Sequence, residues 1–96
     1  MCHNKDEQLR YYLNFLIKNQ RSFALVKIGK QSFEQTKVSV KFVKDKYFLI
    51  FEDPKIIHIL DEKKEFEVNF NHFELLEFSS GLSTAYGGNH IEIEWK

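Results

Sequence analysis

The apolar residues of this chain change their spacing once, and that change limits the folds the chain can adopt. Within residues 6–19, apolar side chains recur every three or four positions, which is the stripe of an amphipathic helix. The stripe consists of Leu9, Tyr12, Leu13, Leu16 and Ile17. From residue 23 onward, apolar and polar residues alternate as in short half-buried strands. Because 96 residues can build only one modest core, we expect residues 1–96 to form a single domain with a β-rich part at 23–96.

The β-rich part contains several strand patterns. We expect strands at 23–28, 36–43, 47–51, 56–60, 66–78 and 91–95. The second and third form the clearest hairpin, and the continuous apolar run of the third predicts a strand buried on both faces. An Asn-His pair at 71–72 marks either a turn or a bulge within the fifth pattern. The last strand points Ile91, Ile93 and Trp95 to one side and is expected to complete a barrel or a sheet edge.

These elements predict the fold class. Residues 79–89 hold three Gly, three Ser and one Thr without periodicity, so we expect a mobile loop there. Ten Phe, four Tyr and one Trp suggest that aromatic residues carry the core. One helix followed by five to seven antiparallel strands predicts an α+β fold, in which an N-terminal amphipathic helix precedes a small antiparallel, partly open or split β-barrel. Closure removes free edges, and the helix covers the remaining gap.

The sequence offers no constellation of catalytic or metal-binding residues. Its four histidines lack the paired spacings of metal sites. They are His3, His58, His72 and His90. His58, within the strand expected at 56–60, should be partly buried, and the single cysteine, Cys2, lies in a terminus expected to fray. Because the carboxylate pairs fall at solvent-facing positions and the glycines of 79–89 lack a following Lys-Ser/Thr, we expect no enzyme, no cofactor and no metal.

Targeting signals are also missing from the sequence. The apolar cluster at 11–17 is interrupted by Asn14 and follows two acidic residues, which is the wrong polarity for a signal peptide. No stretch approaches the run of about 18 apolar residues that a membrane span needs. One cysteine fits a reducing environment. We therefore expect a soluble, cytoplasmic protein without a membrane partner.

The charges of the chain are sorted by position. Residues 1–48 carry ten Lys/Arg against four Asp/Glu, a formal charge of +6, whereas residues 49–96 carry four against ten, a formal charge of −6. Such segregation favours a basic and an acidic face that steer partners. The residues that we predict to contact a partner are Lys37, Lys41, Lys44 and Lys46 on the hairpin and, as a second candidate, Tyr86 within the loop. We predict a non-enzymatic binding module that docks on a protein as a regulator, adaptor or inhibitor.

Other interpretations of the basic residues stay open. A small barrel with a basic groove can bind single-stranded nucleic acid or a nucleotide, with Phe33, Tyr47 and Phe51 as stacking groups. Against this, the pI near 6.9 is far below the usual value of about 9 for phosphate-backbone binders. The lysines are otherwise an ordinary solvated face. Self-association is a further possibility, in which the first half of one copy meets the second half of another, head to tail.

The order of helix and strands resembles the N-terminal split-barrel domain of flagellar-brake proteins over roughly residues 9–80. The resemblance rests on the helix and on the segments 21–28, 32–38, 47–52 and 66–78. In that family the domain precedes a PilZ domain that binds cyclic di-GMP. The resemblance therefore implies a split barrel that serves regulation and protein contact instead of catalysis. It does not extend to cyclic di-GMP binding, because the chain lacks an Arg-x3-Arg pair.

Overall fold

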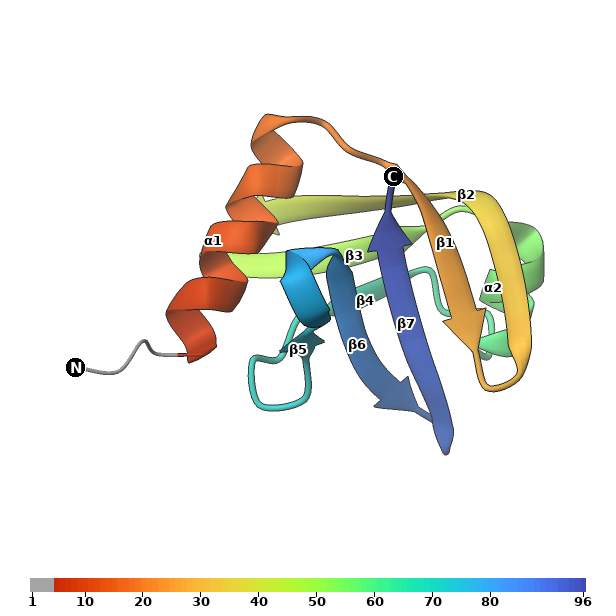
Figure 1. Ribbon diagram of the computed structural model, residues 1–96. Coiled ribbons are helices and arrows are strands. Elements are labelled where there is room, and N and C mark those ends of the chain that lie inside the picture. Colours follow the sequence, from red (N-terminus) through yellow and green to blue (C-terminus); the bar gives the residue numbers. More distant parts are fainter. Residues whose placement is uncertain (1–4) are drawn as a thin grey trace.

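The computed structural model describes residues 5–96, in which an N-terminal helix precedes a seven-stranded antiparallel sheet that curls into a half-barrel (Figure 1). The elements in chain order are α1 (Lys5–Lys18), β1 (Phe23–Ile28), β2 (Gln31–Val43), β3 (Lys46–Phe51), α2 (Pro54–Ile59), β4 (Glu65–Glu67), β5 (Glu74–Leu75), the 3-10 turn η1 (Glu77–Ser79), β6 (Gly81–Tyr86) and β7 (Asn89–Trp95). The strands follow each other in the sheet as β4-β3-β2-β1-β7-β6-β5. The fold is therefore α+β with a partly open barrel, as the sequence predicts. Cys2 and His3 lie outside the described residues.

Helix α1 forms where its apolar stripe predicts it. Leu9, Tyr12, Leu13 and Leu16 are buried, and Ile17 packs against the same core. The helix lies across one end of the curled sheet (Figure 1). Its buried side chains join one core with those of the strands.

Strand β2 belongs to both walls of the half-barrel. Its first part pairs with β1, and its second part pairs with β3. Within the first part, Glu34 and Gln35 together stand opposite Leu25 of β1, which is a β-bulge, and Gln35 has a left-handed φ of 54°. A bulge bends its strand and increases the local twist. In Figure 1, β2 accordingly turns from the upright strands β1 and β7 to the transverse strands β3 and β4.

The predicted hairpin of β2 and β3 is confirmed, but β3 is less buried than expected. Tyr47, Leu49 and Phe51 point into the core, whereas Phe48 and Ile50, which alternate with them, are only half-buried. The expectation that β3 is buried on both faces is therefore wrong. Only one side of the half-barrel wall meets the core, because no second layer covers the outer face.

The core is mainly aliphatic. Its largest side chains with less than 2 % exposure are Leu13, Leu16, Leu49, Ile56, Leu60, Leu82, Ile93, Val26 and Val38. Of the ten phenylalanines, only Phe51 and Phe73 are buried in the core, where Tyr12, Tyr47 and Trp95 join them. Several other aromatic side chains face solvent, namely Tyr11, Phe15, Phe23, Phe42 and Phe78. Aromatic residues thus carry less of the core than their number suggests.

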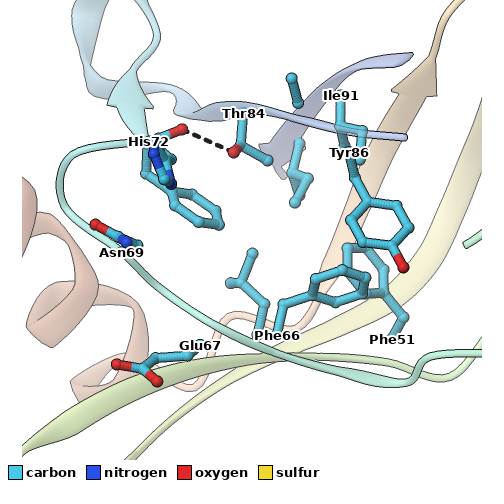
Figure 2. A pocket seen from close by; sticks show the side chains of 12 residues that line it. Phe51, Phe66, Glu67, Asn69, His72, Thr84, Tyr86 and Ile91 are labelled. Atoms are coloured by element: carbon cyan, nitrogen blue, oxygen red, sulfur yellow. Dashed lines mark hydrogen bonds between the residues drawn. The ribbon is translucent and has the colours of Figure 1, made fainter. Parts of the chain in front are cut away.

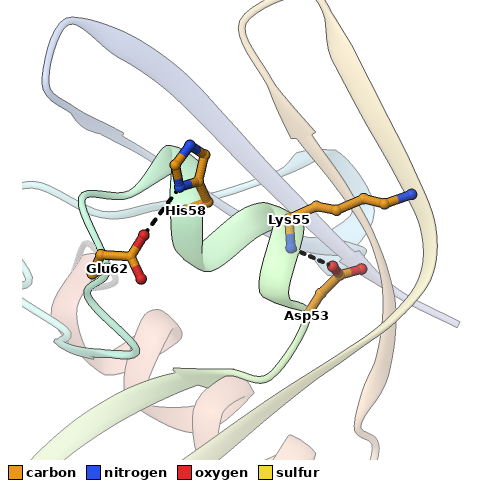
Figure 3. A network of polar contacts seen from close by, with 4 residues as sticks. All are labelled: Asp53, Lys55, His58 and Glu62. Atoms are coloured by element: carbon orange, nitrogen blue, oxygen red, sulfur yellow. Dashed lines mark hydrogen bonds and ion pairs between the residues drawn. The ribbon is translucent and has the colours of Figure 1, made fainter.

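The expected strand at 56–60 is wrong, because this segment belongs to helix α2. Asp53 caps the helix, and its Oδ1 accepts a hydrogen bond from the backbone N–H of Lys55 at 2.9 Å. A proline follows at the first helical position, where a missing N–H group is tolerated. Figure 3 shows this cap and, farther along the helix, the exposed His58, whose Nδ1 lies 3.0 Å from Oε2 of Glu62. The expected partial burial of His58 is therefore also wrong.

The C-terminal half contains more regular structure than expected. The segment 66–78 holds two short strands, and a turn at 70–72 separates them, so the turn alternative at 71–72 is correct. The expected loop at 79–89 is wrong over most of its length, because β6 and the start of β7 occupy it. Gly87 and Gly88, with φ of 58° and 83°, form the two-residue turn between these strands. Strand β7 lies between β1 and β6 and is not an edge.

Candidate binding groove

The lysines predicted to bind a partner do not form one cluster. Nζ of Lys41 lies 3.0 Å from Oε2 of Glu65, and Nζ of Lys46 lies 3.8 Å from Oε1 of Glu67. Both partners belong to β4, so the acidic second half of the chain lies directly beside the basic hairpin. This proximity offsets the field of the two lysines. Lys44 occupies the hairpin turn, with a φ of 53°.

Lys37 lies apart from that turn, beside the end of α1. Together with Arg21 it flanks a groove of about 310 Å³ between α1 and β2, called the α1–β2 groove below. The groove is lined by Leu16, Ile17, Gln20, Arg21, Ser22, Lys37, Ser39 and Val40. Its apolar floor consists of the half-buried Ile17 and Val40, which pack against the core, and the other exposed residues that line it are polar. None of the described residues that line it is acidic.

The end of α1 fixes the position of Arg21. The backbone N–H of Gln20 donates to Ile17 O at 3.2 Å, and that of Arg21 donates to Leu16 O at 3.1 Å. These two bonds, with Gln20 at a left-handed φ of 51°, form the Schellman motif that commonly ends helices. The guanidinium of Arg21 then lies 5.4 Å from the ring centre of Phe15. Arg21 is therefore held at the rim of the groove by the helix end and by an aromatic ring.

Backbone and side-chain hydrogen bonds tie the two walls of the groove together. The N–H of Val38 on β2 donates to Ser22 O, just beyond α1, at 2.6 Å. The carbonyl of Val38 in turn accepts a buried hydrogen bond of 2.9 Å from Nε1 of Trp95. Satisfied buried bonds of this kind hold their surroundings in one arrangement. The walls are thus fixed to each other and to the C-terminal strand.

The groove has positive electrostatic character. Arg21 and Lys37 are both exposed, and an arginine stays ionised at all ordinary pH values. The charge of Arg21 also reaches Tyr12 on the inner side of α1. Burial raises the pKa of Tyr12 to about 12, while Arg21 acts in the opposite direction and Glu94 raises it further. An anionic ligand would therefore find two cations above an apolar surface.

Tyr86, the second candidate, closes the open side of the half-barrel. A cavity of about 110 Å³ lies between β3–β4 and β6–β7 (Figure 2). The ring of Tyr86 meets that of Phe66 edge to face at 5.2 Å, and Phe66 meets Phe51 at 5.6 Å in the same manner. Across the pocket, Oγ1 of Thr84 donates to His72 O at 2.7 Å. The three rings, called the aromatic seam below, give Tyr86 a structural role in joining β6 to β3 and β4.

The rings expected to stack on nucleic-acid bases are mostly inaccessible. Tyr47 is 4 % exposed and Phe51 is 3 % exposed, and Phe33 is half-buried. Stacking on a base requires an open ring face. Sequence reasoning missed Arg21 and Val40, because only the helix end and the bend of β2 bring them together. The only signal for Arg21 was its place directly after the helical stripe.

Comparisons of the chain with protein-family models, with curated proteins and with solved structures found no match. Within residues 5–96, no group of three or more His, Cys, Asp or Glu side chains is placed to hold a metal ion. Over the same range, no helix has both the length and the apolar character that crossing a membrane requires. The chemistry of the α1–β2 groove is therefore the basis for assigning a function.

Proposed function

We propose that this chain is a non-catalytic docking module that binds an acidic segment of a protein partner in the α1–β2 groove. One observation carries the proposal: Arg21 and Lys37 flank an apolar floor, and none of the described residues that line the groove is acidic. A partner segment that combines carboxylates with apolar side chains matches both features. Its carboxylates would pair with the two cations, and its apolar side chains would cover Ile17 and Val40.

This proposal keeps one of the four hairpin lysines and replaces the others. Lys41 and Lys46 already have carboxylate partners on β4, so an incoming anion gains less from them. Lys37 has a second cation nearby, and Arg21 offers the planar fork that binds a carboxylate through two hydrogen bonds. The α1–β2 groove therefore supports docking better than the hairpin turn does.

In this proposal the chain acts in the cytoplasm as a regulator, adaptor or inhibitor. That role agrees with the protein contact implied by the resemblance to the split-barrel domain of flagellar-brake proteins. The split form of the barrel belongs to the same proposal. Support for the proposal comes from α1, which lies across one end of the half-barrel (Figure 1) and forms one wall of the α1–β2 groove.

The test is a titration of the full chain into a fluorescently labelled peptide of alternating glutamate and leucine, read by anisotropy at low and physiological salt. We expect saturable binding that weakens as salt rises. The double variant Arg21→Glu/Lys37→Glu should lose about tenfold or more in affinity, equivalent to about 1.4 kcal/mol. The matched control Lys30→Glu/Lys64→Glu makes the same change in net charge away from the groove and should bind like the original chain.

Two further probes separate this function from its alternatives. A peptide of alternating lysine and leucine should not bind, because its charges repel those of the groove. A single-stranded oligonucleotide should bind more weakly than the acidic peptide. Equal peptide affinity in the groove variant and its control would show that the peptide does not bind in the α1–β2 groove. Oligonucleotide binding that is tighter than peptide binding and falls steeply with salt would favour nucleic acid as the partner.

A further inference from the structure

Among residues 5–96, the most exposed large apolar side chain lies on the turn between β5 and β6. Phe78 is 97 % exposed, and its φ of 61° lies in the left-handed region that aromatic residues rarely adopt. Both properties are unfavourable for a protein in isolation. A strained backbone that presents a ring entirely to water is typical of a site shaped for a partner.

Hydrogen bonds hold this turn in shape. The N–H of Leu76 donates to Gly81 O at 2.9 Å, which closes the base of the turn. Within it, Oγ of Ser80 donates to Glu77 O at 3.1 Å. At its base, a Cβ on Gly81 would come within 1.9 Å of Ile93 O, so the backbone is pressed against β7. Phe78 is therefore presented by a closed turn, which lowers the entropy that a contact must overcome.

The surroundings of Phe78 indicate the charge of its partner surface. Glu77, the residue before it, is exposed. The turn thus combines a protruding ring with an adjacent carboxylate. The complementary surface is an apolar hollow flanked by cations. The α1–β2 groove has this composition, with an apolar floor beneath Arg21 and Lys37.

We propose that the Glu77–Phe78 turn of one copy of this chain occupies the α1–β2 groove of a second copy. The inference rests on the groove assigned under the proposed function and names a second ligand for it. Size permits the contact, because the groove measures about 310 Å³ and a cavity of about 150 Å³ already holds a benzene molecule in another protein. The carboxylate of Glu77 pairs with Arg21 or Lys37 while the ring of Phe78 covers the floor.

The two contacting surfaces differ, so the association is head to tail. A pair of copies joined in this way keeps a free groove on one copy and a free turn on the other, so a third copy can add at either end unless the chain of copies closes into a ring. The contact also covers the groove. Self-association therefore competes with the acidic partner and keeps the module unavailable when that partner is scarce.

Sedimentation velocity of the full chain over a wide range of concentration tests this inference by complementation. The original chain should sediment faster as concentration rises. Phe78→Ser, which removes the ring, and Arg21→Glu/Lys37→Glu, which alters the groove, should each weaken self-association by about tenfold or more. Mixed in equal amounts, these two variants should form a one-to-one complex, because one retains the groove and the other retains the turn. Tyr11→Ser, the control, removes a ring that is 77 % exposed on α1 and should behave like the original chain.

The outcomes separate this inference from the proposed function. A monomeric original chain at all concentrations, or a mixture of variants that stays monomeric, overturns the self-association. If the acidic peptide still binds Phe78→Ser in that case, the docking function survives. If the variants complement each other but the peptide binds none of the chains, the groove serves self-association and the docking function is rejected. Dissociation of the assembly by the peptide supports both.

Discussion

The α1–β2 groove lies between a helix and a strand, whereas the aromatic seam lies between strands of the half-barrel, and the side chains at the two places differ in kind. At the seam, the rings of Phe66 and Tyr86 meet at 5.2 Å and leave a cavity of about 110 Å³. At the groove, the rim residues are Arg21 and Lys37, and about 310 Å³ stays open. One gap is bridged by rings that attract each other, and the other is flanked by like charges.

This difference indicates where stability and binding reside. Rings that pack across a gap bury apolar surface, so their removal should lower the free energy of unfolding. Two cations beside an open groove contribute little to folding, but they attract an anionic ligand. We therefore expect substitutions at the seam to act on stability and substitutions at the groove to act on binding.

The largest expected effect is at the seam. Phe66→Ala removes the ring that touches both Phe51 and Tyr86, and it should lower the free energy of unfolding by about 3 kcal/mol. For a domain of this size, that corresponds to a fall in Tm of roughly 15 °C. Thermal and urea denaturation measure the change. The control Tyr11→Ala, at an exposed ring on α1, should cost less than about 0.5 kcal/mol. Similar losses in the two variants would contradict a structural role for the seam.

The second effect is the alkaline pH dependence of stability that arises from Tyr12, a buried residue of α1. Burial raises the pKa of Tyr12 in the folded protein to about 12, above the value of 10 for an unperturbed tyrosine. Between these two pH values the unfolded chain releases the proton and the folded chain keeps it. Stability from this residue is therefore fully present below pH 10 and is lost as the pH rises to about 12. Urea denaturation of the original chain and of Tyr12→Phe across this range should show a shallower decline in the variant. Parallel curves would exclude Tyr12 as a source of the decline.

Much of this comparison could be predicted from the sequence, and part of it could not. Helix α1 is recognised by its long apolar stripe, and the hairpin is recognised by the alternation in β2 and the continuous apolar run of β3. Helix α2 spans only Pro54–Ile59, and over so few residues the spacing of apolar side chains does not distinguish a helix from a strand. Its one clear signal was the capping aspartate followed by proline. In β6, the small residues between Leu82, Thr84 and Tyr86 make the alternation of a strand hard to recognise. The Gly-Gly pair that follows was the better sign of a hairpin.

The groove itself depends on features that no local pattern reports. Arg21 reaches its place through the Schellman motif at the end of α1, and Lys37 through the bend in β2. The pairing of Lys41 with Glu65 and of Lys46 with Glu67 follows from the position of β4 in the sheet. The order of strands in the sheet is a property of the whole fold. The division of the sequence into a basic and an acidic half therefore could not show which lysines lack a carboxylate partner and can bind a ligand.

A smaller effect concerns the helix end that positions Arg21. Gln20 adopts a left-handed φ of 51° where helices usually place glycine. Gln20→Gly should raise the free energy of unfolding by up to about 1 kcal/mol and leave peptide affinity unchanged. The same replacement inside α1, Gln8→Gly, should lower it by about 1 kcal/mol. Urea denaturation distinguishes the two, and equal destabilisation by both would argue against the helix end described here.

The smallest effect should come from the hairpin lysines. Lys41→Gln removes an exposed ion pair with Glu65 and should change the free energy of unfolding by less than about 0.5 kcal/mol. It should also leave the affinity for the acidic peptide within about twofold. A loss of peptide affinity as large as that of the groove variant would show that the hairpin lysines also belong to the binding surface.

The bulge in β2 gives the chain one position at which it can shorten without reversing a strand. Deleting Gln35 leaves Glu34 alone opposite Leu25, so Thr36 and Phe33 keep their cross-strand partners on β1 and no side chain changes face. What the deletion removes is the bend. The two walls of the half-barrel would then approach a flat sheet, and the groove beside α1 would open. Deleting one codon at this site would therefore change the shape of the half-barrel, while the core would keep the same side chains.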